Sequence, residues 1–268
     1  MTRRARVDAE LVRRGLARSR QQAAELIGAG RVSIDGMPAA KPATAVAVDA
    51  RLTVTGAERS WVSRGAHKLI GALDAFGVVV ESRRCLDAGA STGGFTEVLL
   101  DRGAREVVAA DVGYGQLAWS LRSDSRVTVM ERTNVRGLTF ETIGGPVDLV
   151  VADLSFIALA TVLPALVSCA SPVADIVPMV KPQFEVGKGR VGPGGVVSDP
   201  GVRADAVLSV ARRAAELGWQ TVDVTSSPLP GPSGNVEFFL RLRARTDHPL
   251  RGAPLEDAVR RAIEEGPQ

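Results

Sequence analysis

Three aspartates and one lysine stand directly after short apolar runs of the chain. The runs cover residues 85–86, 107–110, 149–152 and 176–180, and they lead to Asp87, Asp111, Asp153 and Lys181 respectively. Short Val-, Ala- and Leu-rich runs separated by segments of helical length predict buried parallel strands of an open α/β sheet. In such sheets the ligand binds in the crevice beyond the carboxyl ends of the strands. The sequence therefore predicts three carboxylates and one lysine along the rim of a single crevice, which is an active site in outline.

A glycine-rich loop at residues 87–96 follows the first run. Its glycines allow a sharp turn and a close approach of the backbone to a ligand. Asp111 comes 22 residues after Gly89, where a carboxylate can accept hydrogen bonds from a ribose diol. Dinucleotide sites share this logic, but the glycine spacing differs and the acidic Asp87 would repel a pyrophosphate. A cationic ligand tolerates that charge better, so the loop favours S-adenosylmethionine as the cofactor.

The residues predicted to hold this cofactor lie in the loop and after the next two strands. They are Asp87, Gly89, Ser91, Gly93, Gly94, Phe95, Asp111 and Asn134. For Asn134, an ordinary loop asparagine is the alternative. The same loop also fits the G-x-S-x-G nucleophile elbow of an α/β-hydrolase, with Ser91 as the nucleophile and His248 completing a triad. That interpretation leaves Lys181 and the basic N-terminal segment unexplained.

Composition indicates a soluble two-domain protein that contacts nucleic acid. Of the 268 residues, 45% are hydrophobic and 24% charged. Residues 1–60 hold 11 Lys/Arg and 6 Asp/Glu, whereas residues 61–268 hold 22 and 24. A basic module joined to a near-neutral body is typical of nucleic-acid binding. The two histidines and two cysteines have no metal-ligand spacing, so no metal is predicted, and Cys85 and Cys169 are expected to be buried packing residues.

One segment could place the protein in a membrane. Residues 154–174 form a 21-residue run without a charge, which is long enough to cross a bilayer. The run contains Pro164 and Pro172 and lies between two predicted strands, so a buried crossover helix explains it better. The basic start of the chain is followed by Asp8 and Glu10, where a signal peptide needs an apolar core. The protein is therefore expected in the cytoplasm.

The N-terminal module has the pattern of two short helices and short strands. Asp8 is predicted to cap a helix that reaches Gly15, and Ser19 a second that ends near Gly30. Residues 32–34 and 52–55 are predicted strands. The module has no aromatic side chain on which a single strand could stack, so it is expected to bind the phosphates and shape of folded RNA.

The cations expected to contact RNA cluster at the starts of these helices and recur in later loops. The predicted RNA-binding residues are Arg3, Arg4, Arg6, Arg18, Ser19, Arg20, Lys41, Arg64, Lys188 and Arg190. For any single arginine, a solvated charged face is the alternative. Lys188 and Arg190 lie in the glycine-rich segment 187–195, which is either a mobile lid or a disordered connection.

The N-terminal module resembles the S4 RNA-binding domain over residues 5–55. The agreement rests on Arg6-Val7-Asp8, Leu11-Val12, Gly15-Leu16, Ser19-Arg20, Ala23, Leu26-Ile27, Gly30, Val32, Asp35-Gly36 and Lys41-Pro42. The predicted division is an S4-like domain at residues 1–59, a linker at 60–64 and a catalytic domain at 65–268.

Two further charged residues complete a second resemblance. Lys68 begins an amphipathic helix at residues 68–76, and Glu237 lies in a late strand within residues 234–240. Lys68, Asp153, Lys181 and Glu237 resemble, in this order, the K-D-K-E catalytic tetrad of FtsJ-like ribose 2′-O-methyltransferases. With the S4-like module in front, the whole chain resembles the TlyA-type, or haemolysin A-like, family.

This resemblance implies a fold and an activity. The fold is a Rossmann-like methyltransferase sheet, mostly parallel with an antiparallel last strand. The activity is transfer of a methyl group from S-adenosylmethionine to a cytidine 2′-hydroxyl of ribosomal RNA, in one or both ribosomal subunits, with an effect on sensitivity to capreomycin-type antibiotics. The rivals are the hydrolase, a ribosome-binding factor with a vestigial crevice, and a membrane-lytic protein suggested by the haemolysin name and the 154–174 run.

Overall fold

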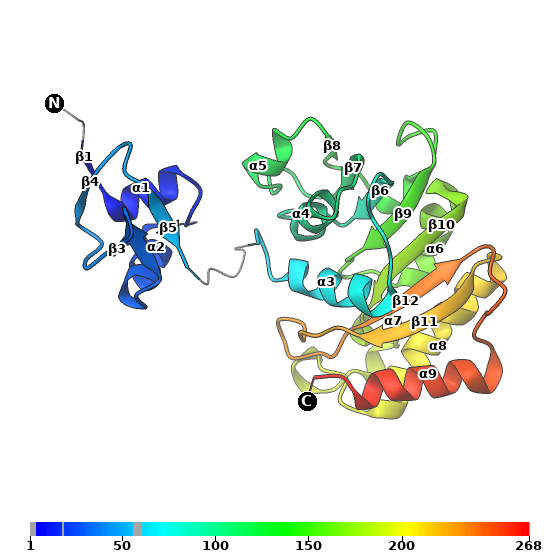
Figure 1. Cartoon of the computed structure of the whole chain (residues 1–268). Helices are drawn as coiled ribbons and strands as arrows, with labels where there is room; N and C mark the ends of the chain where they lie inside the picture. Colours follow the sequence, from blue (N-terminus) through cyan, green and yellow to red (C-terminus); the bar gives the residue numbers. More distant parts are fainter. Residues whose placement is uncertain (1–3, 18, 56–60, 268) are drawn as a thin grey trace. The chain divides into compact units, whose positions relative to one another are not determined.

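The computed structural model describes residues 4–17, 19–55 and 61–267, and it divides the chain into two units. The units are Met1–Trp61 and Val62–Gln268 (Figure 1). The predicted domain limits and the linker at 60–64 stay predictions. Arg3, Arg18 and Ser60, which the sequence analysis singled out or placed in the linker, lie outside the described residues.

The first unit packs two short helices against small antiparallel sheets. Its elements are β1 (Arg4–Arg6), α1 (Val7–Arg13), α2 (Arg20–Gly28), β2 (Val32–Ile34), β3 (Met37–Pro38), β4 (Ala45–Ala47) and β5 (Leu52–Val54). β3, β2 and β5 form one sheet in that order, and β1 pairs with β4. Val7 and Leu11 of α1 and Ala23 and Ile27 of α2 are buried together, because residues three or four apart share one helix face.

The two predicted helix caps of this unit have different outcomes. Ser19 caps α2 by accepting a hydrogen bond from the Gln22 N–H at 3.1 Å, which confirms that prediction. Asp8 is not the cap of α1, because the helix begins at Val7 and its N-cap residue is Arg6. The Asp8 carboxylate instead lies buried in the first turn, where it pairs with Arg6 and Arg20.

The second unit is built on a seven-stranded sheet with the order β11-β12-β10-β9-β6-β7-β8. Its strands are β6 (Arg84–Ala88), β7 (Glu106–Ala110), β8 (Val127–Met130), β9 (Val147–Ala152), β10 (Ala170–Val180), β11 (Gln220–Ser226) and β12 (Phe238–Arg243). Every neighbouring pair is parallel except the two that involve β12. The predicted fold, a mostly parallel sheet with an antiparallel last strand, is confirmed.

Helices connect these strands and cover the sheet (Figure 1). They are α3 (Gly65–Phe76), α4 (Gly94–Asp101), α5 (Trp119–Arg122), η1 (Val135–Gly137), α6 (Leu159–Cys169), α7 (Pro182–Glu185), η2 (Lys188–Arg190), η3 (Pro193–Gly195), α8 (Pro200–Glu216) and α9 (Gly252–Glu264). α6 and α8 contact β10, α9 packs on α8 and β11, and α3 packs on α4.

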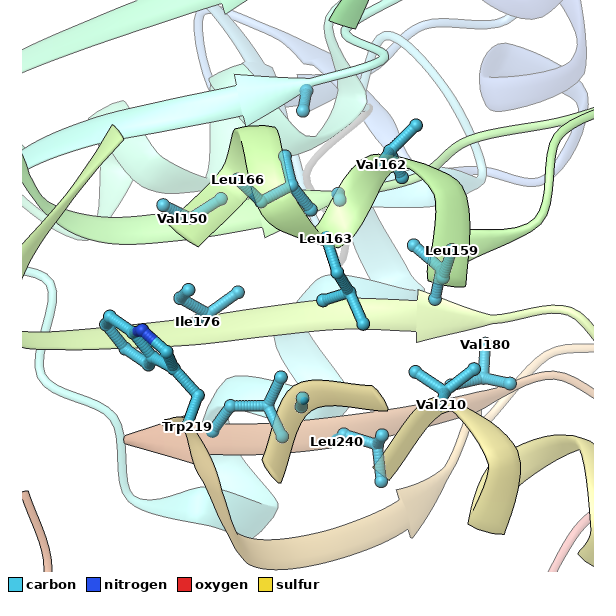
Figure 2. Packing of buried hydrophobic residues seen from close by; sticks show 14 of the residues in the cluster. Val150, Leu159, Val162, Leu163, Leu166, Ile176, Val180, Val210, Trp219 and Leu240 are labelled. Carbon is cyan, nitrogen blue, oxygen red and sulfur yellow. The ribbon is translucent and has the colours of Figure 1, made fainter. Parts of the chain in front are cut away.

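The main core lies between α6, α8 and the centre of the sheet. Figure 2 shows Leu163 and Leu166 of α6, Ile176 of β10 and Leu240 of β12 gathered there, and all four side chains are fully buried. Burying a Leu or Ile side chain contributes about 1.5–3 kcal/mol each, so this packing is what holds the strand ends in place. Both cysteines are buried, as predicted.

The uncharged run at residues 154–174 is a loop, the eleven-residue helix α6 and the start of β10. Leu159, Val162, Leu163 and Leu166 of this helix are buried in the core. Within the described part of the chain, no helix is long and apolar enough to cross a membrane. The membrane-lytic interpretation therefore loses the sequence feature that suggested it.

Candidate active site

A cavity of about 330 Å³ opens at the carboxyl ends of the parallel strands. Its lining comes from α3, the glycine-rich loop, the segments after β9 and β10, and the turn before β12. The lining residues are Ser63, Arg64, Gly65, Lys68, Gly89, Ala90, Ser91, Thr92, Gly94, Phe95, Asp153, Ser155, Lys181, Pro232 and Glu237. The four tetrad candidates, spread over 170 positions of sequence, thus line one cavity.

The four charged side chains form two ion pairs. Lys181 Nζ lies 2.6 Å from Asp153 Oδ1, and Lys68 Nζ lies 2.5 Å from Glu237 Oε2. The side chains of Lys68 and Glu237 are only 8% and 1% exposed. Buried charges are costly unless they are paired, so this pairing is what allows two lysines and two acids to occupy one apolar sheet edge.

Sheet register explains why distant residues meet here. Asp153 and Lys181 directly follow the parallel strands β9 and β10, so both lie at the same edge. β12 runs the opposite way and its first residue, Phe238, pairs with Val180. Glu237 therefore lies beside Lys181 at that edge. It directly precedes β12, which begins at Phe238, whereas the sequence pattern predicts Glu237 inside a strand within residues 234–240.

Asp87 is fully buried behind the glycine-rich loop. Its Oδ2 accepts a hydrogen bond from Thr96 Oγ1 at 2.6 Å, whereas its Oδ1 has no partner. Burial raises the pKa of Asp87 to about 7, and the negative charges of Asp153 and Asp111 act in the same direction, while the Thr96 hydrogen bond lowers it. When ionised, a buried carboxylate with one unpartnered oxygen attracts a cation, so Asp87 favours a cationic ligand in the neighbouring cavity.

The loop itself needs glycine at two places. Gly89 and Gly93 have φ values of +91° and +100°, where a side chain is strained. A Cβ on Gly89 would also collide with the Asp153 carbonyl, and one on Gly93 with Leu121. Of the predicted cofactor residues, Gly89, Ser91, Gly94 and Phe95 line the cavity, whereas Asp87 and Gly93 are not among its lining residues.

Asp111 braces the loop. Its Oδ2 accepts a hydrogen bond from the Ser91 N–H at 2.8 Å, and its Oδ1 accepts one from the Gly113 N–H at 2.6 Å. The space beside it measures only about 10 Å³, about enough for one water molecule, and is also lined by Gln116. The predicted ribose contact of Asp111 stays a prediction.

Asn134 lies apart from the cavities. Its Oδ1 accepts a hydrogen bond from the Arg136 N–H at 3.1 Å and thereby caps η1, and its side chain is exposed. Its predicted contact with adenine stays a prediction.

The hydrolase interpretation is wrong in this fold. Ser91 follows β6 at the carboxyl edge, and its hydroxyl hydrogen-bonds Gln116 Oε1 at 3.3 Å. His248 follows β12, which is antiparallel, so it lies beyond the opposite edge of the sheet. A nucleophile and a base at opposite edges cannot form a triad.

Of the predicted RNA-binding residues in the first unit, two are tied to Asp8. Arg6 and Arg20 pair with its buried carboxylate at 2.8 and 3.1 Å, which holds the pKa of Asp8 well below its usual range. Arg4 and Lys41 are exposed and, among the described residues, have no acidic partner. Ser19 is the cap of α2.

The remaining candidates lie in the second unit. Arg64 lines the cavity and donates a hydrogen bond to the Pro230 carbonyl at 3.1 Å. Arg190 pairs with Asp205 at 2.6 Å on the surface. The 187–195 segment contains η2 and η3, and Asn235 holds its end by donating to the Gly195 carbonyl at 2.9 Å. The side chain of Lys188 lies outside the described part.

Two residues of the site, Ser155 and Asn235, were not among those predicted from the sequence. Ser155 Oγ accepts a hydrogen bond from Lys181 Nζ at 2.9 Å and lines the cavity. Its position two residues after Asp153, at the end of the same strand, was the available signal. Asn235 is 3% exposed, and only its contacts with residues about 40 positions away reveal its role.

Sheet and cavity together define a Rossmann-like methyltransferase. A sequence profile of the FtsJ-like methyltransferase family matches residues 61–244, and one of the S4 domain matches residues 5–52. The chain therefore belongs to the FtsJ-like methyltransferases, in the TlyA-type group that carries an N-terminal S4 domain.

Several relatives share this architecture over most of their length. The chain is 77% identical over 268 residues to the 16S/23S rRNA (cytidine-2'-O)-methyltransferase TlyA of Mycobacterium tuberculosis, with 100% of both chains covered. It is 34% identical over 235 residues to Hemolysin A of Brachyspira hyodysenteriae, covering 87% of this chain and 98% of that protein. A solved structure from Streptococcus thermophilus, which carries the hemolysin name, has 36% identity and a TM-score of 0.72, covering 99% and 98%.

Proposed function

We propose that this protein transfers a methyl group from S-adenosylmethionine to the 2′-hydroxyl of a cytidine in ribosomal RNA. The observation that carries the proposal is the convergence of the Lys181–Asp153 and Lys68–Glu237 ion pairs on one cavity beside the glycine-rich loop. The relative from Mycobacterium tuberculosis, at 77% identity, supports the choice of substrate.

The residues around the loop fit the methyl donor. The cavity has the size of a small-molecule site. The loop that lines it begins at Asp87, whose buried Oδ1 has no hydrogen-bond partner. Ser91, Gly94 and Phe95 would hold the donor, with Asp111 at its ribose. When bound, S-adenosylmethionine supplies a methyl group already activated as a sulfonium, so the protein has to align the acceptor and help it lose its proton.

The tetrad stands where an acceptor nucleotide would meet the donor. A second cavity of about 350 Å³ shares Ser155, Lys181, Pro232 and Glu237 with the first. Lys181 therefore borders both spaces, and we assign it to hold the 2′-hydroxyl and to receive or steer its proton. Asp153 orients Lys181, and Lys68 with Glu237 completes the network against the ribose. Alignment of this kind can supply several kcal/mol of the barrier.

The S4 unit would bring the enzyme to its RNA. Arg4 and Lys41 are exposed cations without acidic partners in the described part of the chain, as phosphate contacts require. Because ribosomal subunits are the source of this RNA, we place the activity in the cytoplasm, and we expect its loss to lower sensitivity to capreomycin-type antibiotics.

Methylation of purified ribosomal subunits tests the proposal. The subunits are incubated with the protein and methyl-labelled S-adenosylmethionine, and the RNA is then cleaved with alkali, which a 2′-O-methyl group blocks at its own position. We expect label at a cytidine that resists cleavage. Label on a base, or no label in either subunit, would contradict the proposal.

A further inference from the structure

Two chain segments face each other at the tetrad. One is the loop at residues 153–158 between β9 and α6, and the other runs from Lys181 through α7 to Glu185. They meet first at Lys181, whose Nζ contacts Asp153 Oδ1 at 2.6 Å and Ser155 Oγ at 2.9 Å. A lysine ammonium has three N–H donors. Asp153 and Ser155 occupy two of them. The third position on Nζ is left for the substrate, either as an N–H that holds the hydroxyl or, in the neutral amine, as the lone pair that takes its proton.

The two segments meet again at Glu185. Helix α6 begins after Ala158, which provides no side-chain cap. Glu185 supplies the missing acceptor from the other segment, because its Oε1 accepts the Leu159 N–H at 2.7 Å. The helix start that anchors the 153–158 loop is thus fixed by a residue four positions after Lys181.

A ring contact lies between these two joints. The rings of Phe156 and Phe184 have centroids 5.3 Å apart and a tilt of 49°. Phe156 also has a φ of +63°, a conformation that non-glycine residues adopt rarely and that needs support from neighbours. Three contacts therefore fasten the loop to the segment that begins with Lys181.

We infer that Ser155 and Glu185 form one positioning device for Lys181, in which Glu185 caps α6, the cap holds the 153–158 loop, and Ser155 of that loop fixes the direction of Nζ. Neither residue belongs to the tetrad. The inference rests on the proposed function, because Lys181 is taken as the residue that handles the 2′-hydroxyl. Catalytic groups need to be held within about 0.5 Å, so a loosened loop lowers turnover without removing any tetrad group.

The accepting oxygen of Glu185, and not its charge, carries this role. Burial raises the pKa of Glu185 to about 7, so at neutral pH the group is ionised only part of the time. Glutamine keeps a carbonyl oxygen at the same place, whereas alanine removes it. Glu185→Gln is therefore the conservative control for Glu185→Ala.

A double-mutant cycle tests the device in the methylation assay. The variants are Ser155→Ala, Glu185→Ala, the double variant and Glu185→Gln, with Ser209→Ala on the exposed side of α8 as the matched control. We expect Ser155→Ala to lower kcat about tenfold, the scale of one hydrogen bond to a charged group, and Glu185→Ala to lower it by a similar or smaller factor. The affinity of each variant for S-adenosylmethionine, measured by calorimetry, should stay within about threefold of wild type. The kcat of Glu185→Gln and of Ser209→Ala should also stay within about threefold of wild type.

Non-additivity is the decisive readout. If both residues act through Lys181, the double variant is no more than about threefold slower than Ser155→Ala alone. If the kcat of the double variant falls by the product of the two single-variant factors, the inference is overturned. It is also overturned if Glu185→Gln loses activity or if Ser155→Ala keeps the kcat of wild type. If Glu185→Ala does not fold, the kcat values of Ser155→Ala and Glu185→Gln still test the inference. If the wild-type protein does not methylate the subunits in this assay, the proposed function fails. If it does, the outcomes above test the positioning device alone.

Discussion

The cations of the cavity and those of the N-terminal unit are paired in different ways. Lys68 and Glu237 are 169 positions apart and nearly unexposed, so their pair exists only when the whole second unit is folded. Arg6 and Asp8 are two positions apart, and the arginine is 50% exposed. The first arrangement fixes charges in place, and the second leaves guanidinium groups at the surface.

Each region is suited to a different task. A buried pair has lost its water, so its geometry is set by the fold and its groups can direct a reaction. An exposed cation contributes little to stability, but it can release counterions when it meets a phosphate. The variants below should therefore affect stability or turnover in the cavity and affinity in the N-terminal unit.

Breaking the buried pair should have the largest effect. Lys68→Met leaves the Glu237 carboxylate without its partner in a site where it is 1% exposed. We expect the free energy of unfolding to fall by about 3–5 kcal/mol, measured by denaturant titration. The double variant Lys68→Met/Glu237→Leu should recover most of this loss while remaining inactive. If Lys68→Met were as stable as wild type, the buried pair would contribute no more to stability than the exposed cations of the N-terminal unit.

The charge behind the loop should make donor binding depend on pH. Because the pKa of Asp87 is raised to about 7, its carboxylate is protonated as the pH falls from 8 to 6 and its attraction for a cation is lost. Affinity for S-adenosylmethionine should thus fall by up to about tenfold over this range. Protonation of a single group cannot change the affinity by more than this when the pH reaches one unit below the pKa of that group. Calorimetry with Asp87→Asn should show a flat profile. A flat profile in the wild type would show that Asp87 does not face the donor.

The exposed cations should give the smallest effects. Arg4→Ala and Lys41→Ala should each raise the KM for ribosomal subunits a few-fold and reduce the salt dependence of binding by about one phosphate contact. Their kcat and thermal stability should stay unchanged, and Arg212→Ala, at an exposed arginine of α8, is the matched control. A lower kcat with an unchanged KM would mean that these residues act in catalysis and not in RNA binding, so the two regions would not differ in role.

Local pattern was enough to predict the sheet and the cavity rim. Asp153 and Lys181 could be placed because the period and composition of β9 and β10 fix where a parallel strand ends. Glu237 required the antiparallel direction of β12, which only the family resemblance supplied. Asp8 was wrongly given a capping role, since sequence does not show that Arg6 and Arg20 converge on its carboxylate.

What sequence did not reveal are contacts made by ordinary residues across long separations. Ser155 and Glu185 have no motif, and their roles depend on two segments 26 residues apart packing together. Asp111 was predicted as a ligand contact, whereas its bonds to the backbone of Ser91 and Gly113 depend on the exact path of the loop.

The role of Lys181 is decided by the single-turnover rate of methyl transfer in Lys181→Ala. Subunits and S-adenosylmethionine are both supplied at saturation, so binding does not limit the rate. We predict a rate at least about 10²-fold below wild type, the scale for removing a general base, with unchanged donor affinity and with the fold retained. A rate within a few-fold of wild type would contradict the assignment of Lys181, and with it the claim that the paired charges of this cavity perform the chemistry.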